Sequence, residues 1–325
     1  MKTLSRRKLI HLVSALGAAS VSTPGFAQLP EKPKSKVYWT PELSSEAFRA
    51  VYSLINQEIS GKVALKLHTG EPGAPNILPR AWVKDLQSKI PNSTIVECNV
   101  LYGSPRQRTE SHREVLRTNG WTFSEVDIMD ADGELVLPVR NGFDIKEFTV
   151  GKNLANYDSM VVLTHFKGHA MGGFGGSLKN IAIGCGSAQG GKKQLHGLFQ
   201  EGGWTGGPIF MERMVDGGSA ILDHFGKKIV FINVMRRMSV DCDCAGTSAA
   251  EPTLPDLGIL ASTDLLAIDK ACVDMIYALP ENVRKPMVER IESRSGLRQL
   301  SAMEEHGLGN PNYEIIKVIN GKPQI

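Results

Sequence analysis

The sequence predicts an α/β fold, a mainly parallel sheet flanked by helices, with a long Gly-rich loop region. Short apolar runs alternate with helical patterns along the chain, which is typical of this fold class. Several of the runs are unbroken apolar segments, as in strands that are buried on both faces of a parallel sheet. Residues 168–207 stand apart, because they contain 14 glycines in 40 residues.

The composition fits a folded domain and excludes nucleic-acid binding. The chain has 325 residues, of which 42% are hydrophobic, enough for one large domain or two lobes. Its 33 glycines and 17 prolines argue against a coiled coil. The net charge of +3 includes four basic residues before residue 28, so the rest of the chain carries −1. A near-neutral body lacks the electrostatic surface that nucleic acids require.

Residues 1–27 are typical of a twin-arginine signal peptide. Ser5-Arg6-Arg7-Lys8 precedes an apolar stretch of about 13 residues, and Gly25-Phe26-Ala27 resembles a cleavage site. The apolar stretch is shorter than the roughly 20 residues of a spanning helix, and no later segment qualifies, so we expect no transmembrane segment in the mature chain. The segment predicts a periplasmic or exported protein with the twin-arginine machinery as a partner. An uncleaved interfacial anchor is the alternative.

The first half of the folded region supplies two strand–helix pairs. Residues 28–36 are polar and Pro-rich and read as a linker, and residues 37–325 as a single α/β domain that could form two lobes. Proline and Asn-Gly are typical helix stops, and they end the two predicted helices. The expected elements are a strand at Lys62–Leu67, a helix from Pro79 to about Ile90, a strand at Ser93–Glu97 and a helix at Ser111–Thr118.

The second half supplies the most apolar strands. Ser159–Thr164 is unbroken, and Lys228–Val234 and Leu257–Leu260 repeat its character. Ser262-Thr263-Asp264 caps the next helix, which Pro280 ends. One or two further helices and an edge strand at Tyr313–Val318 complete the predicted fold.

The Gly-rich region is where we expect the functional site. His165 and His169 directly follow the Ser159–Thr164 strand, and ligands of open α/β sheets bind beyond the carboxyl ends of strands. Histidine serves both as a general base and as a metal ligand, although two hydrogen-bonded structural histidines would give the same pattern. His68 closes an earlier strand in the same way, and His196 adds a third imidazole to the region.

Gly175 and Gly176, followed by Lys179, could bind an anion or form a flexible wall around a ligand. Successive backbone N–H groups make good anion nests. The segment is not a P-loop, because Lys179 does not follow the last glycine directly.

Cys242-Asp243-Cys244 is the strongest metal-binding signal. Two thiols in this spacing are poorly placed for a disulfide with each other but can face one metal. With Cys185 and Cys272 they would complete a four-thiolate set for an iron–sulfur cluster, with zinc or another transition metal as the alternative. Cys272 could instead be core, Cys185 could form a disulfide with the pair, or the thiols could be free. Cys98 ends an apolar strand and is expected in the core.

The chain resembles the domain of unknown function 362 family, whose members are often labelled uncharacterised iron–sulfur centre proteins. The resemblance extends from about Lys62 to Tyr277 and rests on these motifs: Lys66–Gly73, Leu101–Gly103 with His112, His165–His169, Gly175–Asn180, Gly184–Ser187 with Gly191-Lys192 and His196, Asp241–Cys244, Pro255–Ser262 and Asp269–Asp274. Many relatives carry an inserted ferredoxin-type cysteine run, which is missing here. The resemblance therefore implies that a cluster or metal would use the remaining cysteines and histidines, and it names no reaction.

Three functional hypotheses follow. The first is an exported metal- or iron–sulfur-binding protein of unknown reaction, with redox or electron transfer to a partner as one option, using Cys185, Cys242, Cys244 and Cys272, with Gly175 and Gly176 beside the cofactor. The second is a periplasmic enzyme that uses histidine acid–base or mononuclear metal chemistry on a small anion. Its catalytic candidates are His68, His165, His169, Lys179 and His196. The third is a non-catalytic binding or assembly protein.

Overall fold

The computed structural model describes residues 33–199 and 202–324. The predicted signal peptide and residues 28–32 of the predicted linker lie outside these ranges. Residues 34–325 form one unit by their internal contacts. Its first strand begins at Ser35, so the last two residues of the predicted linker belong to the sheet.

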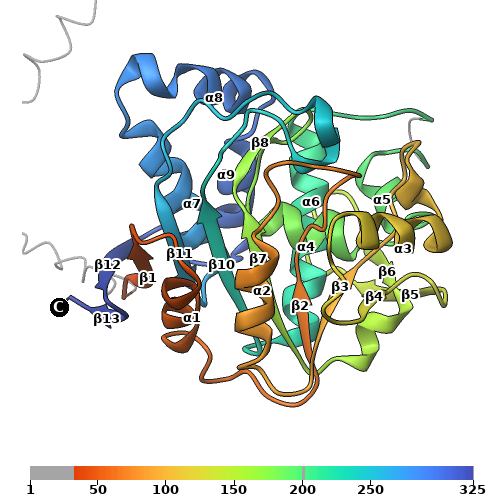
Figure 1. Ribbon diagram of the computed structural model, residues 1–325. Coiled ribbons are helices and arrows are strands. Elements are labelled where there is room, and N and C mark those ends of the chain that lie inside the picture. Colours follow the sequence, from red (N-terminus) through yellow and green to blue (C-terminus); the bar gives the residue numbers. More distant parts are fainter. Residues whose placement is uncertain (1–32, 200–201, 325) are drawn as a thin grey trace, which may run out of the picture. The chain divides into compact units, whose positions relative to one another are not determined.

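A nine-stranded, mostly parallel sheet forms the centre of the described chain (Figure 1), as the sequence predicts. Its strand order is β13-β12-β1-β11-β10-β7-β2-β3-β4. The bounds are β1 (Ser35–Thr40), β2 (Val63–Lys66), β3 (Ser93–Glu97), β4 (Val126–Ile128), β7 (Ser159–His165), β10 (Ile229–Met235), β11 (Gly258–Ser262), β12 (Tyr313–Ile319) and β13 (Lys322–Pro323). Two separate hairpins pair β5 (Glu134–Pro138) with β6 (Glu147–Gly151), and β8 (Lys167–His169) with β9 (Gly173–Gly175).

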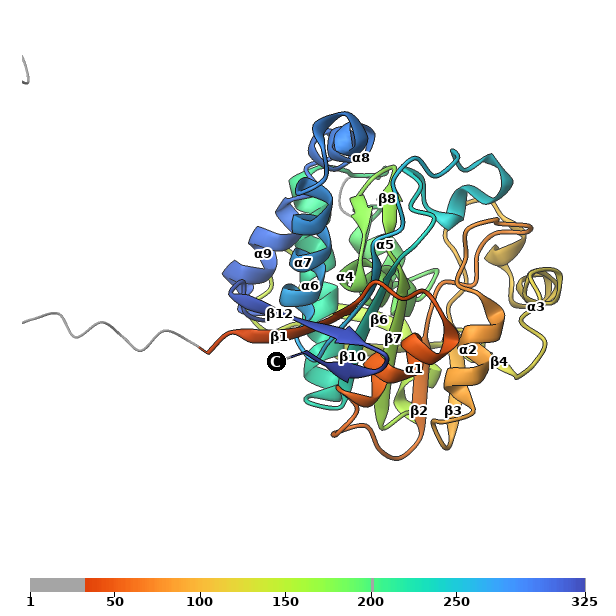
Figure 2. The ribbon, with the colours of Figure 1, turned by 60° about the vertical axis from the view of Figure 1, so that its left-hand side comes forward.

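Helices cover both faces of the sheet (Figure 2). Helices α1 and α2 lie on one face, and α4, α6 and α7 on the other, with α9 packed outside them. The helices are α1 (Ser45–Ser53), α2 (Arg80–Gln87), α3 (Thr109–Thr118), α4 (Ser177–Cys185), α5 (Gly191–Leu195), α6 (Pro208–Phe225), α7 (Leu265–Tyr277), α8 (Glu281–Ser293) and α9 (Arg298–His306). Alternate strand residues enter two separate cores, such as Leu65 on one face and Ala64 on the other.

Local signals place several element ends where the sequence predicts them. The Asp264 side chain accepts the backbone N–H of Ala267 and caps α7, while Pro79 precedes α2. The pairing of two strands differs from what the sequence predicts. In a mainly parallel sheet, β11 runs antiparallel to both of its neighbours, and β12, expected at the edge of the sheet, pairs with the two-residue strand β13. Pairing of this kind depends on distant segments that no local pattern encodes.

The Gly-rich region is not one long loop, which corrects the prediction. Residues 168–207 contain most of the β8–β9 hairpin as well as α4 and α5. A Cβ atom on Gly176 would lie 2.5 Å from the Asp269 carboxylate, which accepts the N–H groups of Ser177 and Leu178 at the start of α4. A Cβ atom on Gly184 would lie 2.2 Å from Lys66 Cε. These glycines therefore permit close packing within the protein.

The strand order reverses between β2 and β7. From β2 the chain continues to β3 and β4 on one side, then returns to β7 and β10 on the other side. Ligands of open α/β sheets bind at such a reversal, beyond the carboxyl ends of the strands. The residues that follow β2 and β7 are therefore the first candidates for a site. Within the described ranges no helix is both long and apolar enough to cross a membrane.

We expect Gly176→Ala to destabilise the fold, because the added methyl group would collide with the carboxylate that anchors α4. Overpacking of this kind costs about 1–3 kcal/mol and lowers the midpoint of thermal unfolding. Gly206→Ala is the matched control, since a Cβ atom there meets nothing within 4 Å. Equal unfolding midpoints for the two variants would contradict this explanation of Gly176.

Candidate functional site

A cavity of about 340 Å³ lies at the carboxyl ends of β2, β3 and β7. Most of the predicted site residues line it: His68, His169, Gly175, Gly176, Lys179, His196, Cys242 and Cys244. Three predicted residues, His165, Cys185 and Cys272, are not among its lining residues. Among the lining residues that the structure describes, Glu97 supplies the single carboxylate, and the other charged side chains are basic: Lys66, Arg106, Lys167, Lys179 and Lys192.

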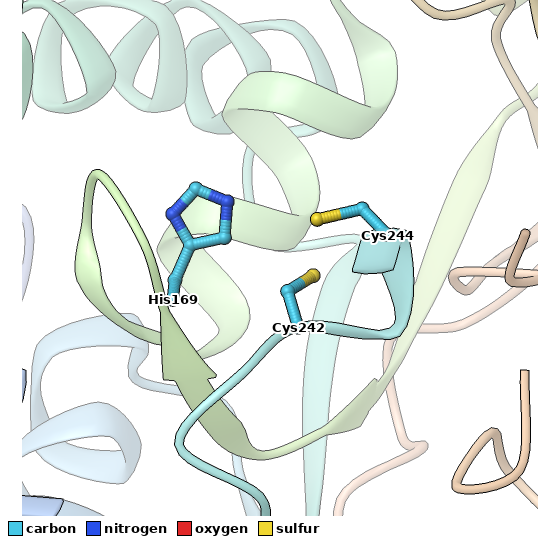
Figure 3. A group of neighbouring side chains, drawn as sticks. All are labelled: His169, Cys242 and Cys244. Atoms are coloured by element: carbon cyan, nitrogen blue, oxygen red, sulfur yellow. The ribbon is translucent and has the colours of Figure 1, made fainter. Parts of the chain in front are cut away.

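His169, Cys242 and Cys244 form a group that could hold a metal ion. One ligand atom from each lies within 4.8 Å of the other two, and no other such group occurs in residues 33–199 and 202–324. Figure 3 shows the imidazole and both sulfur atoms directed into the same space. His169 ends β8, and the cysteines lie in the segment after β10. Two thiolates with an imidazole are a donor set that transition metals such as zinc accept.

The surroundings of the thiol pair favour one thiolate. The hydrogen bond with Cys244 lowers the pKa of Cys242 well below the usual thiol range, and the charge of Lys179 adds to this effect against the opposing influence of burial. The same hydrogen bond, with burial, raises the pKa of Cys244. The pair therefore shares one proton between its two sulfurs, and a bound cation would favour loss of this remaining proton.

Asp243, between the two cysteines, anchors their segment to β7. Its carboxylate accepts His165 Nδ1–H at 2.9 Å and lies 3.4 Å from Lys167 Nζ. Burial alone would raise the pKa of Asp243, but these neighbours lower it to about 2. The other nitrogen of His165, Nε2, donates to the Arg236 carbonyl at 2.8 Å. Both ring nitrogens of His165 therefore have partners within the protein, and the role of this residue is to position the cysteine segment.

The ring of His169 is fixed by the turn that follows it. Its Nδ1 accepts the backbone N–H groups of Gly172 at 2.8 Å and Met171 at 3.2 Å. Gln299 holds the same turn by donating to the Gly172 carbonyl. Burial, reinforced by the charge of Lys179, lowers the pKa of His169 well below its usual range, so the ring is neutral near pH 7.

Glu97 is the centre of a buried hydrogen-bond network beside the cavity. It is 3% exposed and accepts bonds from Arg106 Nη2 at 2.7 Å, Lys66 Nζ at 3.1 Å and both the N–H and hydroxyl of Thr69. His68 Nδ1 lies 3.4 Å from the same carboxylate. Burial opposes ionisation, but the charges of Lys66 and Arg106 hold the pKa of Glu97 well below its usual range.

Sequence reasoning missed Glu97 and Arg106. One signal was present, since Glu97 is an acidic residue at the end of an apolar strand. Arg106 carried no signal, because its partners Glu71, Glu97 and His112 come from separate segments. His112 accepts from Arg106 Nε, and its pKa falls to about 3 through burial and the charge of that guanidinium. His112 therefore serves the network and is not a surface residue.

Three polar groups of the cavity, on His68, His196 and Lys179, have no hydrogen-bond or ion-pair partner in residues 33–199 and 202–324; one of them is Nε2 of His68. His196 is 7% exposed, its ring stacks on Phe210 and is tilted against Trp204, and its Nδ1 makes no hydrogen bond to a described residue. Burial, with the charge of Lys179, lowers the pKa of His196 to about 3. Lys179 lies on the first turn of α4, and no carboxylate is within ion-pair distance of its ammonium group in the described residues.

The predicted four-thiolate set is not assembled. Cys185 ends α4, and its carbonyl accepts the Cys98 thiol at 3.5 Å. Cys272 is buried on α7, where Asn233 donates to its sulfur. Neither joins the group of Cys242 and Cys244, because α4 and α7 direct these two thiols elsewhere. All five cysteines are free thiols, so the disulfide alternative does not occur either.

Comparisons with solved structures find distant likenesses. The lactate racemase apoprotein from Thermoanaerobacterium thermosaccharolyticum aligns with a TM-score of 0.42 and 13% identity, covering 74% of this chain and 57% of its own. A protein from Thermotoga maritima aligns with a TM-score of 0.38 and 12% identity, covering 60% and 51%. The chain thus spans little more than half the length of either structure, and likenesses this weak carry no argument about function.

The sequence itself places the chain in a family. No curated protein matches it significantly. The family described as "Domain of unknown function (DUF362)" matches residues 63–274, which confirms the resemblance drawn from the motifs. The match spans the strands, the glycines and the cysteine pair of the site, and it covers more than half of the chain. This protein therefore belongs to the DUF362 family.

Proposed function

We propose that this protein is an exported metalloprotein that holds one transition-metal ion on the thiolates of Cys242 and Cys244. The observation that carries the proposal is the convergence of two thiols and an imidazole on one wall of a cavity. Thiolates are soft sulfur ligands and imidazole is a nitrogen ligand, and this combination suits zinc and related transition metals. A metal held there would supply Lewis-acid or redox chemistry to a ligand in the cavity.

A single ion fits the donor set better than a four-cysteine cluster. Cys185 and Cys272 do not join the thiol pair, so a cluster on those four cysteines is not part of the proposal. Lys179 and Lys167 supply positive charge beside the sulfurs, which offsets the negative charge of two thiolates. A buried pair of thiolates would otherwise be too costly to maintain.

A second candidate is an enzyme that acts on a small anionic molecule in the same cavity. It is favoured by two groups that have no partner among residues 33–199 and 202–324: the ammonium of Lys179, which has no carboxylate beside it, and the buried Nδ1 of His196, which makes no hydrogen bond. A carboxylate or similar group would satisfy both, because an ammonium group and a ring N–H are donors to anions. The apolar ring of Trp204 would cover the remainder of such a ligand.

Protein purified with its signal segment intact is expected to contain about one zinc or other transition-metal ion per chain. Cys242→Ser with Cys244→Ser should remove it, because serine hydroxyls do not replace thiolates as soft ligands. Metal content by plasma mass spectrometry and the visible spectrum are the measurements.

Cys272→Ser is the matched control, since it removes a buried thiol outside the group and should leave the metal content unchanged. Retention of the ion by the double variant would contradict the proposal. Intense visible absorbance with two irons and two sulfides per chain would replace the single ion with a cluster.

Lys179→Met should abolish stabilisation by a small dicarboxylate such as succinate. Ligands that bind the folded state raise the unfolding midpoint in proportion to their affinity. The expected result is a rise with succinate for the wild type and no rise for the variant, measured by thermal unfolding. Lys193→Met removes the same charge outside the cavity and should respond as the wild type does. Equal responses of the two variants would count against the anion site.

Export is proposed from Ser5-Arg6-Arg7-Lys8 and the apolar stretch after it. Arg6→Lys with Arg7→Lys should leave the chain in the cytoplasm at its full precursor length, because the translocation machinery recognises the signal by its arginine pair. Lys2→Gln removes a charge outside the pair and should not affect export. Fractionation followed by immunoblotting is the measurement, and a periplasmic double variant would contradict this route.

A further inference from the structure

We propose that the ligand of this cavity is a linear dicarboxylate, with one carboxylate bound by Lys179 and the other by Lys192, near opposite ends of α4. The inference rests on the second candidate of the proposed function, the anion site, and names its substrate class. It also gives a role to Lys192, which the sequence pattern leaves without one.

The first step concerns the charge of the cavity wall. Three of the five lysine and arginine side chains that line it are paired with the carboxylates of Glu97 or Asp243. The other two, Lys179 and Lys192, have no carboxylate within ion-pair distance in residues 33–199 and 202–324. A divalent ion on the two thiolates would leave this balance unchanged, because its charges and theirs cancel. A ligand with two negative charges would therefore complement the wall.

The second step concerns the unused hydrogen-bonding capacity of Lys192. The residue is only 5% exposed, and its Nζ donates to the Gly186 carbonyl at 2.5 Å, its one acceptor among the described residues. An ammonium group carries three N–H donors, so two of them have no acceptor. Buried donors almost always have one. Because Lys192 lines the cavity, an oxygen atom of a ligand there would fill the unused donors.

The third step concerns the separation of the two lysines. Lys179 lies on the first turn of α4, whereas Gly186, which binds Lys192, directly follows the last turn. The seven residues from Lys179 to Gly186 rise about 10 Å in an α-helix. A Cβ atom on Gly175 would lie 3.4 Å from Lys179 Cδ, so this side chain extends over the residue before the helix and away from Gly186. The two positive charges therefore do not share one point.

The lining between and around the lysines suits a hydrocarbon chain. Ile183 lies one turn after Lys179 on the same face of α4 and lines the cavity. Val100, Leu101 and Met171 add further apolar contacts. Each end offers one ammonium group, which matches the single charge of a carboxylate. A doubly charged phosphate group would instead require both lysines at one point.

His196 lies within reach of both ends. Its backbone N–H donates to the Lys192 carbonyl one helical turn earlier, so the two side chains are on the same side of α5. Burial is the main cause of the lowered pKa of His196, and the charges of Lys179 and Lys192 add to it. Its buried Nδ1 has no partner in the described part of the chain, and an N–H group there would donate to a ligand carboxylate.

Calorimetric titration of the full chain with matched acids tests the number of charges. Succinate, glutarate and adipate are each compared with the monocarboxylate of equal carbon number, namely butyrate, pentanoate and hexanoate. At the chain length that spans the two lysines, the dicarboxylate should bind about 10-fold or more tightly, the effect of one added bond between charged groups. Equal affinities at every chain length would overturn the inference, and this comparison needs only the wild type.

Substitutions of the two lysines test their separate roles. Lys192→Met should lower dicarboxylate affinity to the level of the monocarboxylate, with the monocarboxylate still bound at Lys179. Lys192→Arg retains the positive charge and should still prefer the dicarboxylate. Lys193→Met removes a charge from the same helix outside the cavity and should behave as the wild type. Circular dichroism and the unfolding midpoint without ligand verify that each variant is folded.

The outcomes separate this inference from the anion site on which it rests. If the acids bind, Lys179→Met weakens them and Lys192→Met does not, the anion site stands and the role of Lys192 is wrong. If monocarboxylates and dicarboxylates bind equally, the site stands for a single charge and the dicarboxylate class is wrong. If none of the six acids binds, the anion site itself fails.

Discussion

The cavity depends on an ionised carboxylate that has been withdrawn from water, that of Glu97. A buried charge is costly unless paired and hydrogen-bonded, and Glu97 satisfies this condition with Lys66, Arg106 and Thr69. These partners join the ends of β2 and β3 to the turn that carries Arg106. Loss of any one partner would leave the buried charge of Glu97 only partly compensated. The network therefore fixes the end of β2, and with it the ring of His68.

A second buried carboxylate, Asp243, performs the corresponding task for the thiols. It is bonded to His165 and lies beside Lys167, so the segment between Cys242 and Cys244 is tied to the end of β7. The site is thus assembled on two neighbouring parallel strands, each fixed by its own ion-pair network. Parallel strands bring their carboxyl ends to one edge, which explains why residues far apart in the chain meet there.

The histidines show how hydrogen bonding assigns chemistry to identical side chains. His165 directs its two ring nitrogens at the Asp243 carboxylate and the Arg236 carbonyl, whereas His112 accepts from Arg106. His169 accepts at Nδ1, and Nδ1 of His196 has no partner in the part of the chain that the structure describes. Residue type alone could not distinguish these states, because each depends on a partner from another segment.

The sequence by itself determined the main strands and helices and the end of the sheet at which the site lies. Short apolar runs predicted β2, β3, β7 and β10, and the residues at and after their ends supplied most of the cavity lining. These features are encoded locally, in periodicity, caps and turn residues.

Only the tertiary structure decided which of these residues meet. It separated Cys185 and Cys272 from the thiol pair, placed α4 and α5 in the Gly-rich region, and brought Glu97 to His68. It also gave Gly176 a neighbour in Asp269, which accounts for that glycine without any ligand. The direction of a buried side chain depends on the packing of helices and strands distant in sequence, and that information is absent from any local pattern.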